Sequence, residues 1–72
     1  MVAEFIRKKR RQKKVSQQEI AALLARPQSY VARIESGEKR VELSEIILIL
    51  DAIAVPLSEL EEVLRRELAR KS

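Results

Sequence analysis

Residues that interrupt helices are rare in this sequence, which has one glycine and two prolines among its 72 residues. Ala, Leu, Ile, Glu, Lys and Arg are abundant and favour helix, and no stretch alternates between apolar and polar residues as a half-buried strand does. We therefore predict an all-α fold. The spacing of apolar residues places five helices at about 2–13, 17–24, 28–36, 43–54 and 58–69, with a frayed tail at 69–72.

Capping signals define several of the expected helix ends. Ser16 and Ser58 each stand three residues before a glutamate, the spacing of a capping box, in which a hydroxyl and a carboxylate satisfy two backbone N–H groups. Pro27 is suited to the first turn of the helix at 28–36, where its missing N–H has no helical partner. Gly37 is suited to the left-handed residue that ends this helix.

The composition excludes several functional classes. Cysteine and histidine are absent, which removes disulfides, thiolate nucleophiles and the usual zinc sites. We therefore expect no enzymatic activity, catalytic residue, metal, cofactor or small-molecule ligand. The longest apolar run, residues 46–50, is far shorter than the roughly 20 residues that span a bilayer, so no membrane partner is expected. These features predict one small cytoplasmic domain over residues 1–72.

Charge divides the chain into a basic half and an acidic half. Residues 1–40 hold eleven Lys or Arg against four acidic residues, a net charge of +7, and residues 41–72 hold four against seven, a net charge of −3. The basic half is suited to a polyanion. Within it, the run RKKRRQKK at 7–14 is by itself unspecific and fits a solvated helix face, a nuclear-import-like patch or a phosphate contact.

The predicted helix at 28–36 has an unusual outer face. Val31 and Ile34 lie close together around the helix and are expected to face the core. The opposite strip carries small and amide-bearing side chains, where a solvated surface would more often carry Glu and Lys. This strip consists of Gln28, Ser29, Ala32 and Arg33.

Four segments follow in a fixed order: SQQEIA at 16–21, PQSYV at 27–31, RIESGEKR at 33–40 and LSEL at 57–60. Together they resemble the helix-turn-helix core of the phage repressor and Cro family, also called the xenobiotic-response-element type, over about residues 5–64. The resemblance implies a five-helix, lambda-repressor-like DNA-binding domain. In such a domain the helix at 28–36 enters the major groove of double-stranded DNA and the helix at 17–24 crosses the backbone.

The same resemblance implies roles for individual residues. The residues implied to read base edges are Gln28, Ser29, Ala32 and Arg33. The residues implied to contact phosphate are Gln17, Tyr30, Lys39 and Arg40. Tyr30 is equally suited to packing beside the turn, and Lys39 and Arg40 to being solvated loop charges. Arg10 and Glu35 occupy positions that the family joins in a largely buried ion pair.

The turn of the motif departs from the family pattern at two positions. Ala25 stands where the family usually has glycine, and Pro27 stands where it often has a capping Ser or Thr. If the backbone path is kept, Ala25 must adopt a positive φ, which strains a residue that carries a Cβ.

We expect a sequence-specific transcriptional regulator that binds an inverted-repeat operator as a homodimer. The helix at 58–69 carries a longer apolar stripe than packing on the helix at 43–54 requires. The expected dimer interface is Ile47, Leu48, Val63, Leu64 and Leu68. Alternatively, Leu64 and Leu68 cover the core of their own monomer. The competing function is a small antitoxin-like or adaptor module that holds a partner protein with the helices at 43–54 and 58–69.

Overall fold

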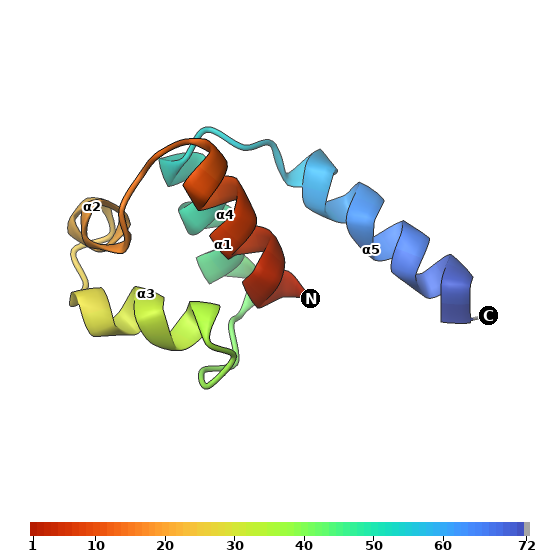
Figure 1. Cartoon of the computed structure of the whole chain (residues 1–72), viewed down its shortest axis with the longest axis horizontal. Helices are drawn as coiled ribbons and strands as arrows, with labels where there is room; N and C mark the ends of the chain where they lie inside the picture. Colours follow the sequence, from red (N-terminus) through yellow and green to blue (C-terminus); the bar gives the residue numbers. More distant parts are fainter. Residues whose placement is uncertain (72) are drawn as a thin grey trace.

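The computed structural model describes residues 1–71, and over this part of the chain it contains only helices and the loops that join them. The all-α prediction is confirmed. The helices are α1 (Val2–Gln12), α2 (Gln17–Leu23), α3 (Gln28–Glu35), α4 (Leu43–Ala52) and α5 (Leu57–Lys71). In Figure 1, α2 and α3 lie on one side of α1 and α4, and α5 extends away on the other side.

Several helix ends differ from the expected ones. Pro27 precedes α3 and has extended backbone angles (φ −65°, ψ 154°), so it is the N-cap and not part of the first turn. Ser58 lies inside the first turn of α5, because this helix begins at Leu57 directly after Pro56. Residues 69–71 are helical, so the frayed tail expected there is wrong for these three residues, and residue 72 lies outside the described part.

The other signals for helix ends act as expected. Ser16 Oγ accepts a hydrogen bond from the Glu19 backbone N–H, and Glu19 Oε1 accepts one from the Ser16 N–H, both at 3.0 Å. Gly37 ends α3 with φ +83°. The positive φ predicted for Ala25 is confirmed at +56°. Lys14 and Ala54, which follow α1 and α4, also have positive φ angles, of 58° and 55°.

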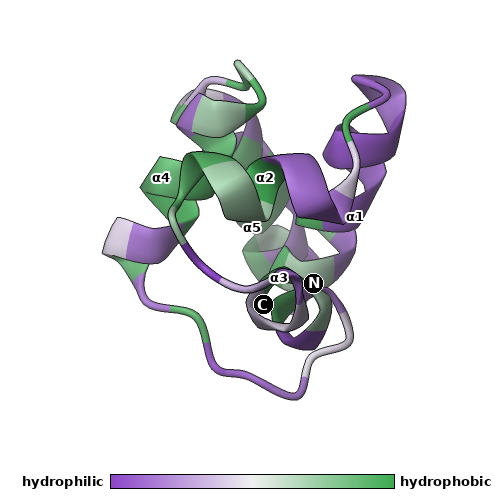
Figure 2. Ribbon diagram, turned by 90° about the vertical axis from the view of Figure 1, so that its left-hand side faces the viewer, coloured by the Kyte–Doolittle hydropathy of each residue, from purple (hydrophilic) through white to green (hydrophobic). Residues whose placement is uncertain are grey.

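Aliphatic side chains from all five helices form the core. α1 contributes Phe5 and Ile6, which directly precede the basic run at 7–14. α4 is the most apolar helix in sequence and contributes Ile46, Ile49 and Leu50 at helical spacing. Figure 2 shows this contrast, with hydrophilic residues along much of α1 and hydrophobic ones along α4. The fully buried side chains are Ile6, Ile20, Val31, Ile34, Ile49 and Leu50.

Candidate nucleic-acid interface

The outer strip of α3 faces away from the core. Val31 and Ile34 are almost fully buried and fix the rotation of the helix about its axis. The opposite face therefore points outward: Gln28, Ser29 and Arg33 are exposed. Ala32, the fourth residue of the predicted strip, is half-buried and so offers a methyl group close to the helix surface.

A chain of amide hydrogen bonds runs along one flank of α3. Gln28 Nε2 donates to Gln17 Oε1 at 2.6 Å, and Gln17 Nε2 donates to Glu35 Oε1 at 3.0 Å. Gln17 on α2 thus bridges the first and last residues of α3. Gln17 was expected to contact phosphate. In the structure its side chain is half-buried and holds Gln28 in place.

Glu35 is the end point of this chain and forms a buried ion pair with Arg10. Arg10 Nε and Glu35 Oε2 lie 2.6 Å apart, Arg10 Nη2 donates to Glu35 Oε1 at 3.0 Å, and the two side chains are 12% and 3% exposed. Burial works to raise the pKa of Glu35, but hydrogen bonds from Arg10 and Gln17 outweigh it, so this pKa lies below its ordinary value. Arg10 Nη1 also donates to the carbonyl of Val15 at 3.0 Å. The pair that the resemblance implied therefore ties α1 to the end of α3.

The opposite flank of α3 carries Tyr30. Its hydroxyl donates a hydrogen bond to Glu45 Oε2 on α4, and two cations lie near its ring. Arg26 is 5.3 Å and the Lys39 ammonium 5.5 Å from the ring centroid, within the range of cation–π attraction. Burial and the bond to Glu45 raise the pKa of Tyr30 to about 12. Tyr30 was expected either to pack beside the turn or to contact phosphate. In the structure its hydroxyl is already hydrogen-bonded to Glu45 within the protein.

Glu45 accepts hydrogen bonds from three directions. Besides Tyr30, the backbone N–H of Glu42 donates to Glu45 Oε1 at 2.9 Å, and the Lys39 ammonium lies 3.4 Å from Oε2. The Tyr30 hydroxyl and then the Glu42 N–H lower the pKa of Glu45 to about 2. Glu45 is thus a fixed negative charge beside a helix that is expected to approach DNA.

The loop after α3 positions the remaining cations differently. Arg40 is exposed and has no ion pair within the described residues, whereas Lys39 is folded against Tyr30 and Glu45. Arg33 Nε lies 3.9 Å from Glu38 Oε2, and both side chains are well exposed. An exposed pair at this distance contributes little and leaves Arg33 able to reorient.

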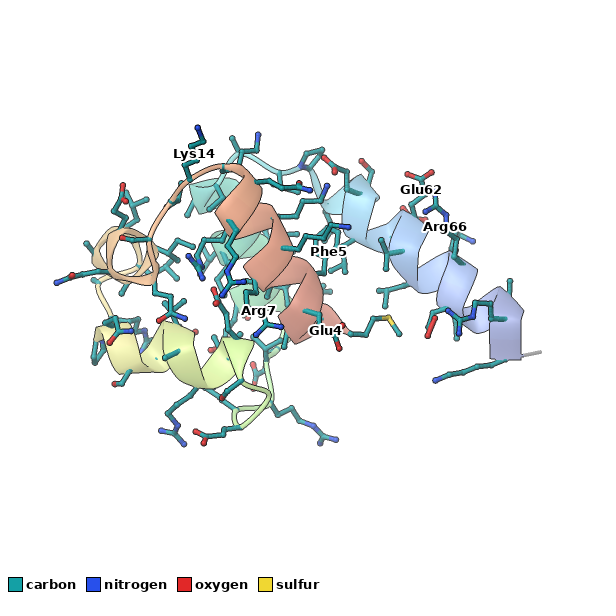
Figure 3. All side chains as sticks on the ribbon, in the orientation of Figure 1. Glu4, Phe5, Arg7, Lys14, Glu62 and Arg66 are labelled. Carbon is teal, nitrogen blue, oxygen red and sulfur yellow. The ribbon has the colours of Figure 1, made fainter. Side chains whose placement is uncertain are left out.

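The basic run on α1 separates into three roles. Arg10 is half-buried in its pair with Glu35. Lys9 Nζ lies 2.6 Å from Glu59 Oε1, which joins α1 to α5, and 5.7 Å from the Phe5 ring centroid. The other cations are exposed, and some line a shallow surface depression. Figure 3 shows Arg7 on the flank of α1 that faces α3 and Lys14 in the turn that follows the helix.

The residues expected at a dimer interface do not lie on one surface. Leu48 lines a depression with Arg26 and Tyr30, whereas Val63 lines another between α1 and α5. Val63 and Leu64 are half-buried and pack on the core, while Ile47, Leu48 and Leu68 are exposed, Leu68 the most at 67%. Leu43 and Leu57 are exposed too, although the sequence analysis did not single them out.

Sequence reasoning missed Arg26 and Glu45. Arg26 precedes Tyr30 by four residues, a spacing that brings side chains together within a helix, but a turn separates the two here. Glu45 lies 15 residues after Tyr30 on another helix, and no periodicity in the sequence predicts their contact.

This architecture, with a tight turn between α2 and α3 and a polar outer strip on α3, defines the class of helix-turn-helix proteins. A family model described as helix-turn-helix matches residues 6–60, most of the chain. The protein therefore belongs to the helix-turn-helix family of the xenobiotic-response-element type, as the resemblance indicated, and is a DNA-binding transcription regulator. This family consists of regulators and not of enzymes.

No curated protein matches the chain. Within residues 1–71, no helix combines the length and apolar character required to cross a membrane, and no cluster of three potential metal-binding residues occurs.

Proposed function

We propose that the protein binds an inverted-repeat operator as a homodimer, with α3 of each protomer in the major groove. The observation that carries this proposal is the outer strip of α3, which is polar but nearly uncharged and is backed by a rigid support. The buried Arg10–Glu35 pair fixes α3 to α1, and the hydrogen bonds of Gln17 fix α3 to α2. A rigid helix of this kind presents side chains to base edges with defined geometry.

The proposed contacts follow from exposure and chemistry. Gln28 is suited to a bidentate contact with adenine and Arg33 to one with guanine. Ser29 offers a hydroxyl, and the methyl group of Ala32 is suited to a thymine methyl. Among the four proposed phosphate contacts, Arg40 is the exposed one, whereas Gln17, Tyr30 and Lys39 have their polar groups engaged within the free protein.

The proposed dimer uses the outer stripe of α5. Leu57, Leu64 and Leu68 follow at spacings of seven and four residues and so share one face of the helix. Leu57 is 42% and Leu68 67% exposed. Leu48 lies beside Tyr30 and Val63 lies beside α1, so neither residue belongs to this stripe. Ile47 is then the remaining α4 residue proposed for the interface.

Selection of bound sequences from a random duplex pool tests the proposal. We expect enrichment of a two-fold-symmetric site whose half-sites are about 34 Å apart, one turn of DNA. Enrichment of a single unrepeated motif would contradict the dimer. No enrichment, with weak binding of all duplexes even at low salt, would favour a protein-binding role for α4 and α5.

A further inference from the structure

Lys39 is held by the protein itself, although it lies in the loop that is proposed to meet a phosphate. Its ammonium is 3.4 Å from Glu45 Oε2, 5.5 Å from the Tyr30 ring centroid and 3.5 Å from the carbonyl of Arg40. The side chain is only 32% exposed. The positive charge is thus already compensated before any DNA arrives.

Glu45 cannot easily leave this position. The Tyr30 hydroxyl and the backbone N–H of Glu42 bind its two oxygens from different elements, α3 and the N-terminus of α4. A carboxylate on a flexible, solvated side chain would swing away when a phosphate approached. This carboxylate is restrained, so it stays beside Lys39 and also repels an approaching phosphate.

Arg40, the next residue, provides an internal comparison. It belongs to the same loop and is exposed, with no ion pair among residues 1–71. The two adjacent cations therefore differ in whether a carboxylate of the protein is already paired with them, which bears directly on phosphate binding.

We propose that Glu45 competes with the DNA phosphate for Lys39 and thereby weakens binding to DNA of any sequence. The inference rests on the proposed function, and it makes Glu45 a positioning residue that acts through Lys39. Because the competition depends on a phosphate and not on base identity, it lowers the affinity for random DNA. Cognate DNA, which is held in register by base contacts, can place a phosphate close enough to displace the carboxylate.

The test is the salt dependence of binding to a random-sequence duplex. Glu45→Gln keeps hydrogen-bonding groups for Tyr30 and for the Glu42 N–H but removes the charge. We expect its affinity at low salt to rise by up to about fivefold, the range of a partly exposed ion pair. The slope of log K against log salt should steepen by about one, because Lys39 now neutralises a phosphate. In the Glu45→Gln background, Lys39→Gln should reverse the change in slope.

Glu42→Gln is the matched control. It removes the same charge from the same end of α4, and no ion pair joins Glu42 to Lys39 within the described residues. An increase in affinity and slope as large as that of Glu45→Gln would overturn the inference, because it would reflect net charge alone.

A second comparison in the wild-type background covers the case in which Glu45→Gln does not fold. Arg40→Gln should flatten the salt slope by about one, and Lys39→Gln should flatten it by clearly less. Equal effects of the two substitutions would overturn the inference. Absence of wild-type binding to any duplex at low salt would instead contradict the proposed function.

Discussion

At the scale of single residues, Glu35 connects the stability of the fold to the orientation of Gln28, a proposed base-reading residue. One of its oxygens receives hydrogen bonds from both Arg10 and Gln17, and Gln17 in turn holds Gln28. A buried carboxylate of this kind is costly when its partner is lost, because the remaining charge has no solvent to compensate it. The same residue therefore supports the fold and the orientation of an outward-facing amide.

Removing one partner of the buried pair should be strongly destabilising. We expect Arg10→Met to lower the free energy of unfolding by about 3–5 kcal/mol, since it leaves Glu35 buried and unpaired. The double variant Arg10→Met with Glu35→Leu should recover much of this loss. Urea unfolding measures both, and a double variant less stable than the single one would contradict this explanation.

Stability should decrease in acid because of Glu35 and Glu45. Both have pKa values lower in the folded protein than the ordinary 4.5, and that of Glu45 is about 2. Their stabilising effect is fully present above about pH 4.5 and is lost as the pH falls through the folded values. Thermal unfolding between pH 6 and pH 2 should therefore show a falling midpoint, and Glu45→Gln should make this fall smaller.

Base reading should depend on Gln28 and Arg33. Replacing either with alanine is expected to lower affinity for the selected operator by about 1–3 kcal/mol and to leave binding to random duplex nearly unchanged. Gln18→Ala, on the exposed face of α2, is the control. Titrations by fluorescence anisotropy compare them, and equal losses on both duplexes would exclude the residue as a reader.

At the scale of elements, α1, α2 and α4 are each followed by a left-handed residue other than glycine. Lys14, Ala25 and Ala54 all follow a helix with φ between 55° and 58°. Ala25 adopts this left-handed conformation, and the N–H of the next residue, Arg26, donates a hydrogen bond to the Ala21 carbonyl at 2.9 Å. The turn before α3 therefore carries strain that a glycine would relieve.

Ala25→Gly should stabilise the protein by up to about 1 kcal/mol. Ala22→Gly, at an exposed position inside α2, should instead destabilise it by about 0.5–1 kcal/mol, because there glycine only adds conformational freedom to the unfolded chain. Opposite signs in thermal unfolding would support the explanation. A loss of stability at both positions would show that strain at Ala25 is negligible.

Local signals predicted the elements well because they depend on neighbours in sequence. The capping box at Ser16 and the end of α3 at Gly37 each involve residues no more than a turn apart, whereas the positive φ of Ala25 was predicted from the family resemblance. The start of α4 was predicted without its cause, which is the Glu42 N–H bonded to Glu45. The Tyr30 cluster was not predictable, since it requires the packing of α3 against α4 and the course of the intervening loop.

At the scale of the whole molecule, α5 separates from the other helices. Leu60 is buried and Val63 and Leu64 pack on the core, but Leu68 lies beyond this contact and is largely exposed. The longest dimension of the molecule is 39 Å, and the outer part of α5 lies at one end of it (Figure 1). Leu68 is a large exposed apolar side chain on this mostly charged helix end, and it is suited to contact a second copy of the chain.

Leu68→Glu should produce monomers at micromolar concentration and weaken operator binding without loss of helix content. Leu23→Glu is the control, because Leu23 on α2 is equally exposed at 67%. Sedimentation and circular dichroism measure the two effects. A Leu68→Glu variant that stays dimeric, or a wild-type protein that is monomeric on its operator, would show that this stripe is not the interface.

The ion pair between Lys9 and Glu59 has a consequence for operator architecture. It joins α1 to the first turn of α5, near the point where α5 leaves the other helices. In a dimer built on α5, the angle at this junction sets the distance between the two copies of α3. The range of half-site spacings that the protein accepts is then a direct measure of how stiff this junction is.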